Sequence, residues 1–148
     1  MPIPDLNEHG FLPSGIHDCS LEEIGARFST FQSTDRRSRL HRRLRAFLEE
    51  VRSTNLVVAV IVNGSFVTSK PDPGDIDLIL VLPSTHDFSV ALPPMAYNVL
   101  SRRRVRRRYG FDVLVAREDA REYVEYLEYF QQVRGRPGEQ KGILRIQL

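Results

Sequence analysis

The chain has 148 residues, a length that suits one compact domain with its own hydrophobic core. Of its 21 basic residues 19 are arginines, yet 19 acidic residues leave a formal net charge of only +2. An arginine excess fits phosphate recognition and GC-rich coding equally well, so it does not identify a partner. The single cysteine, Cys19, excludes an intrachain disulfide.

Two further features exclude a membrane role and a secretory one. The longest wholly apolar run, residues 56–62, is far too short to cross a bilayer. The first ten residues lack the basic and then apolar order of a secretory signal. We therefore expect a cytoplasmic protein with no membrane partner.

The N-terminal part predicts an irregular arm followed by two helices. Residues 1–19 are rich in Pro, Gly and His and predict the arm. Ser20-Leu21-Glu22-Glu23 has the form of a capping box and predicts a short helix to about Phe28. Thr34 or Asp35 can cap the next helix, which Asn55 ends. Its apolar residues recur at helical spacing and are Leu40, Leu44, Phe47, Leu48 and Val51. The arginines left on flanking or exposed faces are Arg36, Arg39, Arg42, Arg43 and Arg45.

The middle of the chain predicts two strands joined by a tight connection. Residues 56–62 are apolar and mostly β-branched, which is typical of a strand covered on both faces. Residues 65–70 have room for only a short helical turn. Pro71-Asp72-Pro73-Gly74 is strong turn chemistry and leads into a second strand, residues 76–82.

The C-terminal half predicts helices alternating with strands. We expect a helix over residues 94–108 with Gly110 as its cap, a third strand over 111–116 and a helix over 118–133. Residues 142–148 alternate in polarity, as in an edge strand. The fold class is therefore α/β or α+β, with a small mixed β-sheet, flanking helices and a single domain over 1–148.

Three carboxylates stand at the predicted sheet, where acids are costly. Asp75 and Asp77 are two residues apart and so project on the same side, whereas Ile76 and Leu78 project on the other. If the third strand pairs with the second, Asp112 can join them. Such a cluster is stable only if protons or a cation offset the repulsion, and its oxygen ligands suit Mg²⁺ or Mn²⁺.

Gly64-Ser65 follows the first strand and complements the acids. A glycine there lets the backbone approach a ligand closely, and the amides of the next turn can point at phosphate oxygens. The motifs Val62-Asn63-Gly64-Ser65 and Asp75-Ile76-Asp77, followed by Asp112 on a later strand, resemble the nucleotidyltransferase superfamily typified by DNA polymerase beta. The likeness is to its minimal, single-domain members and spans about residues 40–116. The arm Leu12-Pro13-Ser14-Gly15-Ile16-His17 is similar to one small, uncharacterised prokaryotic group of such proteins.

The resemblance implies an activity and a role for each motif. Asp75 and Asp77 would bind two metal ions, and Asp112 would hold the ion that activates the attacking hydroxyl. Gly64 and Ser65 would hold the β- and γ-phosphates of a nucleoside triphosphate. The implied reaction transfers a nucleoside monophosphate to a hydroxyl on a protein or RNA. Minimal members often act as antitoxins on a small helical partner protein, so such a partner is a further expectation.

Two other interpretations compete with this one. The chain could be a non-catalytic relative that binds a partner protein or nucleic acid. The arginines at 102–104 and 106–108 could contact phosphates, or they could be solvated cations at the C-terminal end of a helix, where they complement its dipole.

Overall fold

The computed structural model describes residues 3–29 and 35–148. Its sheet has five strands in the order β1-β5-β2-β3-β4. The strands are β1 (Ile16–Asp18), β2 (Ala59–Asn63), β3 (Asp77–Leu82), β4 (Asp112–Arg117) and β5 (Ile143–Gln147). β2 runs antiparallel to β5 and β3, whereas β1 is parallel to β5 and β4 is parallel to β3. The expected fold, a small mixed sheet with flanking helices, is confirmed.

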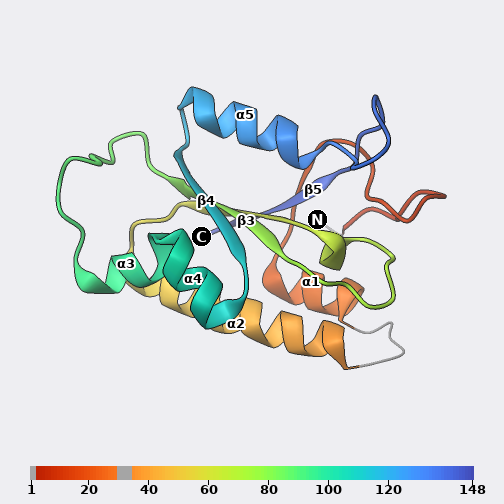
Figure 1. Cartoon of the computed structure of the whole chain (residues 1–148), viewed down its shortest axis with the longest axis horizontal. Coiled ribbons are helices and arrows are strands. Elements are labelled where there is room, and N and C mark those ends of the chain that lie inside the picture. Colours follow the sequence, from red (N-terminus) through yellow and green to blue (C-terminus); the bar gives the residue numbers. More distant parts are fainter. Residues whose placement is uncertain (1–2, 30–34) are drawn as a thin grey trace.

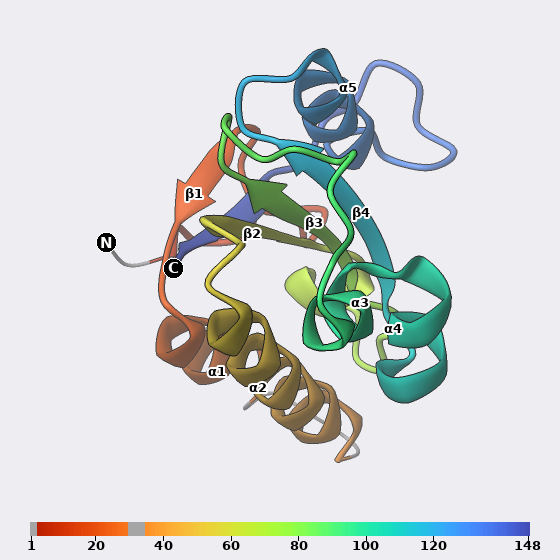
Figure 2. The same cartoon turned by 90° about the vertical axis from the view of Figure 1, so that its left-hand side faces the viewer.

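Helices cover both faces of this sheet. They are α1 (Leu21–Phe28), α2 (Arg36–Thr54), α3 (Pro94–Leu100), α4 (Arg102–Tyr109) and α5 (Arg121–Phe130), with a 3₁₀ turn η1 (Ser65–Val67) after β2. α1 to α4 lie on one face and α5 lies on the other (Figures 1 and 2). β2 and β3 are therefore buried on both sides, which explains why their sequences are apolar except for Asn63 and Asp77 at one end.

Alternate residues of the central strands belong to different cores. Leu78 and Leu80 of β3 pack in the larger core with α1, α2, α3 and α4. Ile79 and Val81 pack in the smaller core with Phe130 of α5. The face of the sheet on which a side chain lies thus follows directly from its parity along the strand.

Two of the predicted helix-end signals, Ser20 and Asn55, act as expected. The Glu23 amide donates to the Ser20 hydroxyl, and the Ser20 amide donates to the Glu23 carboxylate, both at 3.1 Å. Asn55 ends α2 in the left-handed conformation, at φ +56°. Thr34 lies outside the described residues, and the Asp35 side chain makes no capping hydrogen bond to α2.

The predicted apolar stripe of α2 is buried, and one charged residue, Arg37, is buried with it. It precedes Leu40 by three residues and so lies on the same stripe, and its side chain is fully buried. Its guanidinium donates to the main-chain oxygens of Phe28 at 3.0 Å and of Phe66, Thr68 and Lys70 at 2.6 Å each. Burial lowers the pKa of Arg37 to about 10. Arg37 thus joins α2 to the segment that follows Gly64-Ser65.

The helix predicted over residues 94–108 is two helices. Ser101 adopts an extended conformation between them, at φ −83° and ψ 117°, and its hydroxyl accepts a hydrogen bond from the Arg104 amide. Serine is a strong N-cap residue because its oxygen satisfies an amide that has no partner within the helix. Ser101 therefore starts α4 where the apolar periodicity alone predicts continuity.

Two predictions for the sheet were wrong. β5 lies between β1 and β2, so it is not an edge strand. Its other neighbour, β1, belongs to the segment that was predicted to be an irregular arm. A strand of three residues is too short to show alternation, so only its pairing with β5 reveals it. In residues 3–29 and 35–148, no helix is both long enough and apolar enough to span a membrane.

Candidate active site

Asp77 and Asp112 are the first residues of two neighbouring parallel strands, and they are register partners. On the other side of β3, Asp77 is paired with Asn63, the last residue of β2. Partners in adjacent strands project on the same face, so these three side chains form one row across the sheet. The row lies on the face that α5 covers. The expected pairing of the second and third strands thus brings Asp112 to Asp77.

Asp77 is the most perturbed acid of the row. Its half-buried carboxyl has a pKa raised to about 6, first because burial disfavours the charged form and then because Asp75 and Asp112 repel it. Among the described residues, no side chain donates a hydrogen bond to it. The repulsion predicted for this cluster is therefore present, and it falls mainly on Asp77.

Asp75 joins the row through Ser65. The Ser65 amide donates to Asp75 Oδ1 at 2.9 Å, and the Ser65 hydroxyl donates to the same oxygen. Burial opposes ionisation of Asp75, but the two hydrogen bonds from Ser65 outweigh it and hold the pKa of this carboxyl below its usual range. The Ser65 amide and hydroxyl, which were expected to bind phosphate, thus donate to Asp75 instead. A phosphate could accept these hydrogen bonds only by displacing Asp75.

Gly64 lies close to the main chain of Asp75 and Asp77. Its φ of +101° is a conformation that favours glycine. A β-carbon at this position would stand 2.8 Å from the main-chain oxygen of Asp75 and 3.2 Å from the amide of Asp77. Because the segment that enters β3 packs directly against residue 64, there is no room for a side chain at this position.

Asp112 also has a protein partner. Arg106 of α4 reaches it with an N–O distance of 2.7 Å, and both side chains are more than half exposed. Two of the three acids are therefore engaged, Asp75 by Ser65 and Asp112 by Arg106. As they stand, no three His, Cys, Asp or Glu side chains in the described ranges form a group that could hold a metal ion.

A pocket of about 1370 Å³ contains all five predicted site residues, Gly64, Ser65, Asp75, Asp77 and Asp112. It extends from this end of the sheet to the C-terminal end of α5 and the loop that follows it. Its basic lining residues are Lys70, Arg102, Arg134, Arg136 and Lys141. Both lysines of the chain are among them. The pocket thus combines a carboxylate cluster with a cationic rim, which suits a metal–polyphosphate ligand.

Lys141 is a site residue that sequence reasoning missed. Burial lowers its pKa, while the charges of Asp75 and Asp77 oppose that effect, and Lys141 lines the same pocket as the two acids. The Lys141 amide donates to the Gln131 main-chain oxygen at 2.8 Å, and the next amide, that of Gly142, donates to Leu12 at 2.8 Å. These contacts fix the loop at the pocket. The one signal in the sequence is that lysine is scarce, with only two in the chain. No rule of residue spacing predicts that residue 141 lies near residue 75.

The donor set matches Mg²⁺ in kind, since all three candidate ligands are carboxylates and Asp77 lacks a hydrogen-bond partner among the described residues. Binding would require Asp75 and Asp112 to exchange their present contacts for the ion. Asp75, Asp77 and Asp112 are the residues that would hold it.

Comparisons with known proteins place the chain in a family without giving it an activity. A search of the curated proteins finds no match, and a search of the solved structures finds none either. The model of a protein family, described as a family of unknown function (DUF6932), matches residues 4–147. Because this match covers almost the whole chain, the protein belongs to that family.

Proposed function

We propose that this protein is a Mg²⁺-dependent nucleotidyltransferase that transfers a nucleoside monophosphate from a nucleoside triphosphate to a hydroxyl on a protein or RNA. The observation that carries the proposal is the register pairing of Asp77 with Asp112, beside Asp75 and in one pocket with Gly64-Ser65. A carboxyl group that lies among other acids and has a pKa as high as that of Asp77 is typical of sites that bind a cation or transfer a proton.

The reaction makes one bond and breaks one. The acceptor oxygen bonds to the α-phosphorus, the bond from that phosphorus to the bridging oxygen breaks, pyrophosphate leaves, and the hydroxyl proton passes to water. Metal ions held by the three acids would stabilise the entering and departing oxygens. Gly64 allows the tight turn that carries Ser65, whose amide and hydroxyl can turn from Asp75 to a phosphate. Lys141 compensates the negative charge that remains.

The test is transfer of label from nucleoside triphosphates that carry a radioactive α-phosphate. The protein is incubated with each of the four triphosphates, Mg²⁺, and cell extract as a source of protein and RNA hydroxyls. We expect a labelled product that requires Mg²⁺. Asp77→Asn should abolish it, whereas Asp87→Asn, which changes an exposed acid outside the pocket, should not. Equal labelling by wild type and Asp77→Asn would refute the assignment.

The non-catalytic alternative makes a different prediction. A binding module that uses the same face of the sheet should capture a partner protein even after Asp75, Asp77 and Asp112 are all replaced by Asn. It should also show no stabilisation by a triphosphate with Mg²⁺. A thermal-shift measurement of the four triphosphates with and without Mg²⁺ separates the two functions without knowledge of the acceptor.

A further inference from the structure

The arginine-rich segment does not sit where a dipole argument would put it. The break at Ser101 makes Arg102, Arg103 and Arg104 the first turn of α4. A helix N-terminus carries partial positive charge, so cations there destabilise the helix. The dipole accounts only for the arginines of the last turn, residues 106–108. Arg102, Arg103 and Arg104 need another explanation.

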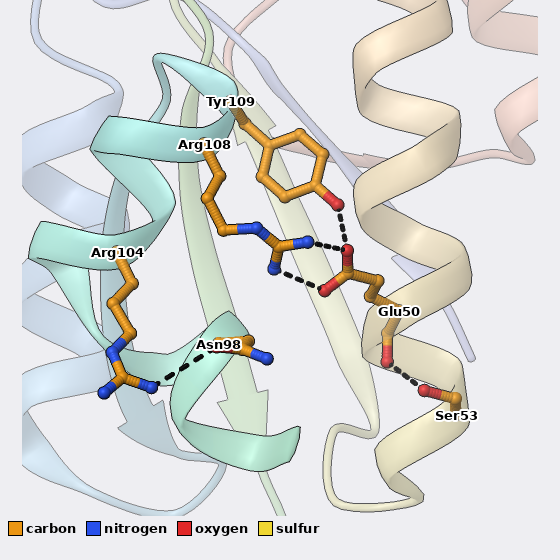
Figure 3. Close-up of polar contacts among 6 residues, drawn as sticks. All are labelled: Glu50, Ser53, Asn98, Arg104, Arg108 and Tyr109. Carbon is orange, nitrogen blue, oxygen red and sulfur yellow. Dashed lines mark hydrogen bonds and ion pairs between the residues drawn. The ribbon is translucent and has the colours of Figure 1, made fainter. Parts of the chain in front are cut away.

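Three of the six arginines are used within the fold. Arg108 donates to both oxygens of Glu50 on α2, at 2.8 and 2.6 Å, and the Tyr109 hydroxyl reaches the same carboxylate. Arg104 donates to the Asn98 side chain at 3.3 Å (Figure 3). Arg106 pairs with Asp112. These contacts dock α4 on α2 and on the sheet.

The other three, Arg102, Arg103 and Arg107, have no hydrogen-bond or ion-pair partner in the described part of the chain. All three are exposed. Arg103 and Arg107 are four residues apart and share one face of α4. Arg102 lines the pocket that holds the three acids. The unpaired charge therefore runs from the pocket along the exposed side of α4.

Neighbouring elements extend this surface. The Arg43 guanidinium of α2 lies beside Gly110, 4.0 Å from where a β-carbon would stand. Tyr97 of α3 is 49 % exposed, and the Arg104 guanidinium lies 5.4 Å from the centre of its ring. Guanidinium groups bind phosphates, and an exposed aromatic ring beside them can stack with an unpaired base. An acidic protein would interact with the guanidinium groups but would not need the exposed ring of Tyr97. The ring therefore favours nucleic acid as the partner.

We propose that the α4 surface, defined as Arg43, Tyr97, Arg102, Arg103 and Arg107, binds single-stranded nucleic acid and directs its terminal hydroxyl into the pocket. This inference rests on the proposed function, since it names the acceptor of the transfer. Single strands are favoured over a duplex because Tyr97 can stack only with an unpaired base, and because a chain end has to enter the pocket.

The test measures binding of a fluorescent 12-nucleotide RNA of mixed sequence, and of the DNA of the same sequence, by anisotropy at several salt concentrations. Arg103→Gln/Arg107→Gln should weaken binding of RNA at least tenfold at 50 mM salt. It should also reduce the slope of log affinity against log salt by roughly 1.4, or about 0.7 for each lost phosphate contact. Tyr97→Ala should weaken binding about fivefold or more with the slope unchanged.

A matched control separates this surface from general charge. Arg45→Gln/Arg52→Gln removes the same charge from exposed positions of α2 that lie about half a turn around the helix from Arg43. It should leave affinity within about twofold. Equal losses in the two double variants would overturn the inference, and so would a lack of binding by the wild type. Competition by polyglutamate as effective as that by RNA at the same charge would identify an acidic protein as the partner and would also overturn it.

Asp77→Asn distinguishes this inference from the proposed function. The variant should bind RNA as well as the wild type does, because Asp77 is not part of the α4 surface. If RNA binds through α4 but no preparation transfers label, the surface stands and the proposed function fails. If label is transferred to a protein and the α4 variants do not alter RNA binding, the proposed function stands and the α4 surface is refuted.

Discussion

Ser65 directs both its amide and its hydroxyl at a single oxygen of Asp75, ten residues along the chain. The same hydroxyl accepts a hydrogen bond from the Gly74 amide at 3.0 Å, so it closes the connection between β2 and β3. One side chain thus joins the glycine–serine turn to the acid cluster. A cation at Asp75 and a phosphate at Ser65 would compete with this contact together, so the two ligands should bind cooperatively.

Ser65→Ala should weaken binding of a triphosphate with Mg²⁺ and destabilise the free protein by about 1 kcal/mol at pH 7. The sign follows from the low pKa of Asp75, whose ionised form stabilises the fold above the unfolded-state pKa. The loss should therefore shrink as the pH falls below about 4, where the carboxyl takes up a proton first in the unfolded chain and, at lower pH, in the folded wild type. Urea unfolding at pH 3 to 7 measures it.

The chain contains a matched control for Ser65. Ser89 donates its amide and its hydroxyl to Asp87 Oδ1, at 2.9 and 2.7 Å, in an exposed loop away from the pocket. Ser89→Ala should leave binding of the triphosphate with Mg²⁺ unchanged. Equal effects of the two substitutions on that binding would contradict the role of Ser65.

Asp77→Asn should stabilise the metal-free protein at pH 7 and have little effect at pH 4. The pKa of Asp77 in the fold is about 6 and its usual value is 3.8, so the folded state holds the proton more tightly. Stability from this group is complete below pH 4 and is lost as the pH rises through 6. A full burial penalty of that size would be about 3 kcal/mol, and the partial exposure of Asp77 reduces it to roughly 1–2 kcal/mol.

Melting temperatures measured in EDTA between pH 4 and 8 test this effect, because they record the metal-free protein. Asp87→Asn, at an exposed position, is the control. A fold that collapses in Asp77→Asn without metal would show instead that the residue is structural.

Lys141→Met should lower the affinity of the metal-free protein for inorganic tripolyphosphate, because it removes a positive charge from the lining of the pocket. Its effect on stability at pH 7 should be small or favourable, since burial lowers the pKa of Lys141 despite the opposing charges of Asp75 and Asp77, so the fold disfavours the charged lysine. Lys141→Arg keeps the charge and should restore most of the affinity, as measured by calorimetry. If Met and Arg behave alike, the charge of residue 141 does not act in the pocket.

Arg37→Met should be among the most damaging substitutions in the chain. It leaves buried main-chain oxygens of Phe28, Phe66, Thr68 and Lys70 without this donor. We expect a loss of about 3–5 kcal/mol, measured by urea unfolding. Arg45→Met, on an exposed position of the same helix, should cost less than about 0.5 kcal/mol. A small effect at residue 37 would mean that water replaces the guanidinium.

Much of the site follows from local rules. The alternation of side chains along β3 puts Asp77 opposite Leu78, and a carboxylate inside an apolar segment is unusual enough to be noticed. The capping box at Ser20 and the left-handed Asn55 likewise depend on only a few neighbouring residues, so they could be predicted. The buried Arg37 was not predicted because the stripe of α2 was defined by its apolar residues alone, although the position of residue 37 on that stripe was visible.

The sequence by itself determined most of the helices, the central strands and the face of β3 that Asp77 occupies, because these depend on periodicity within a few residues. Only the tertiary structure decided that β5 is inserted between β1 and β2, and that Lys141 shares a pocket with Asp75, 66 residues away in the sequence. Such contacts depend on how elements distant in sequence pack, and burial and charge act there through space. No pattern along the chain records them.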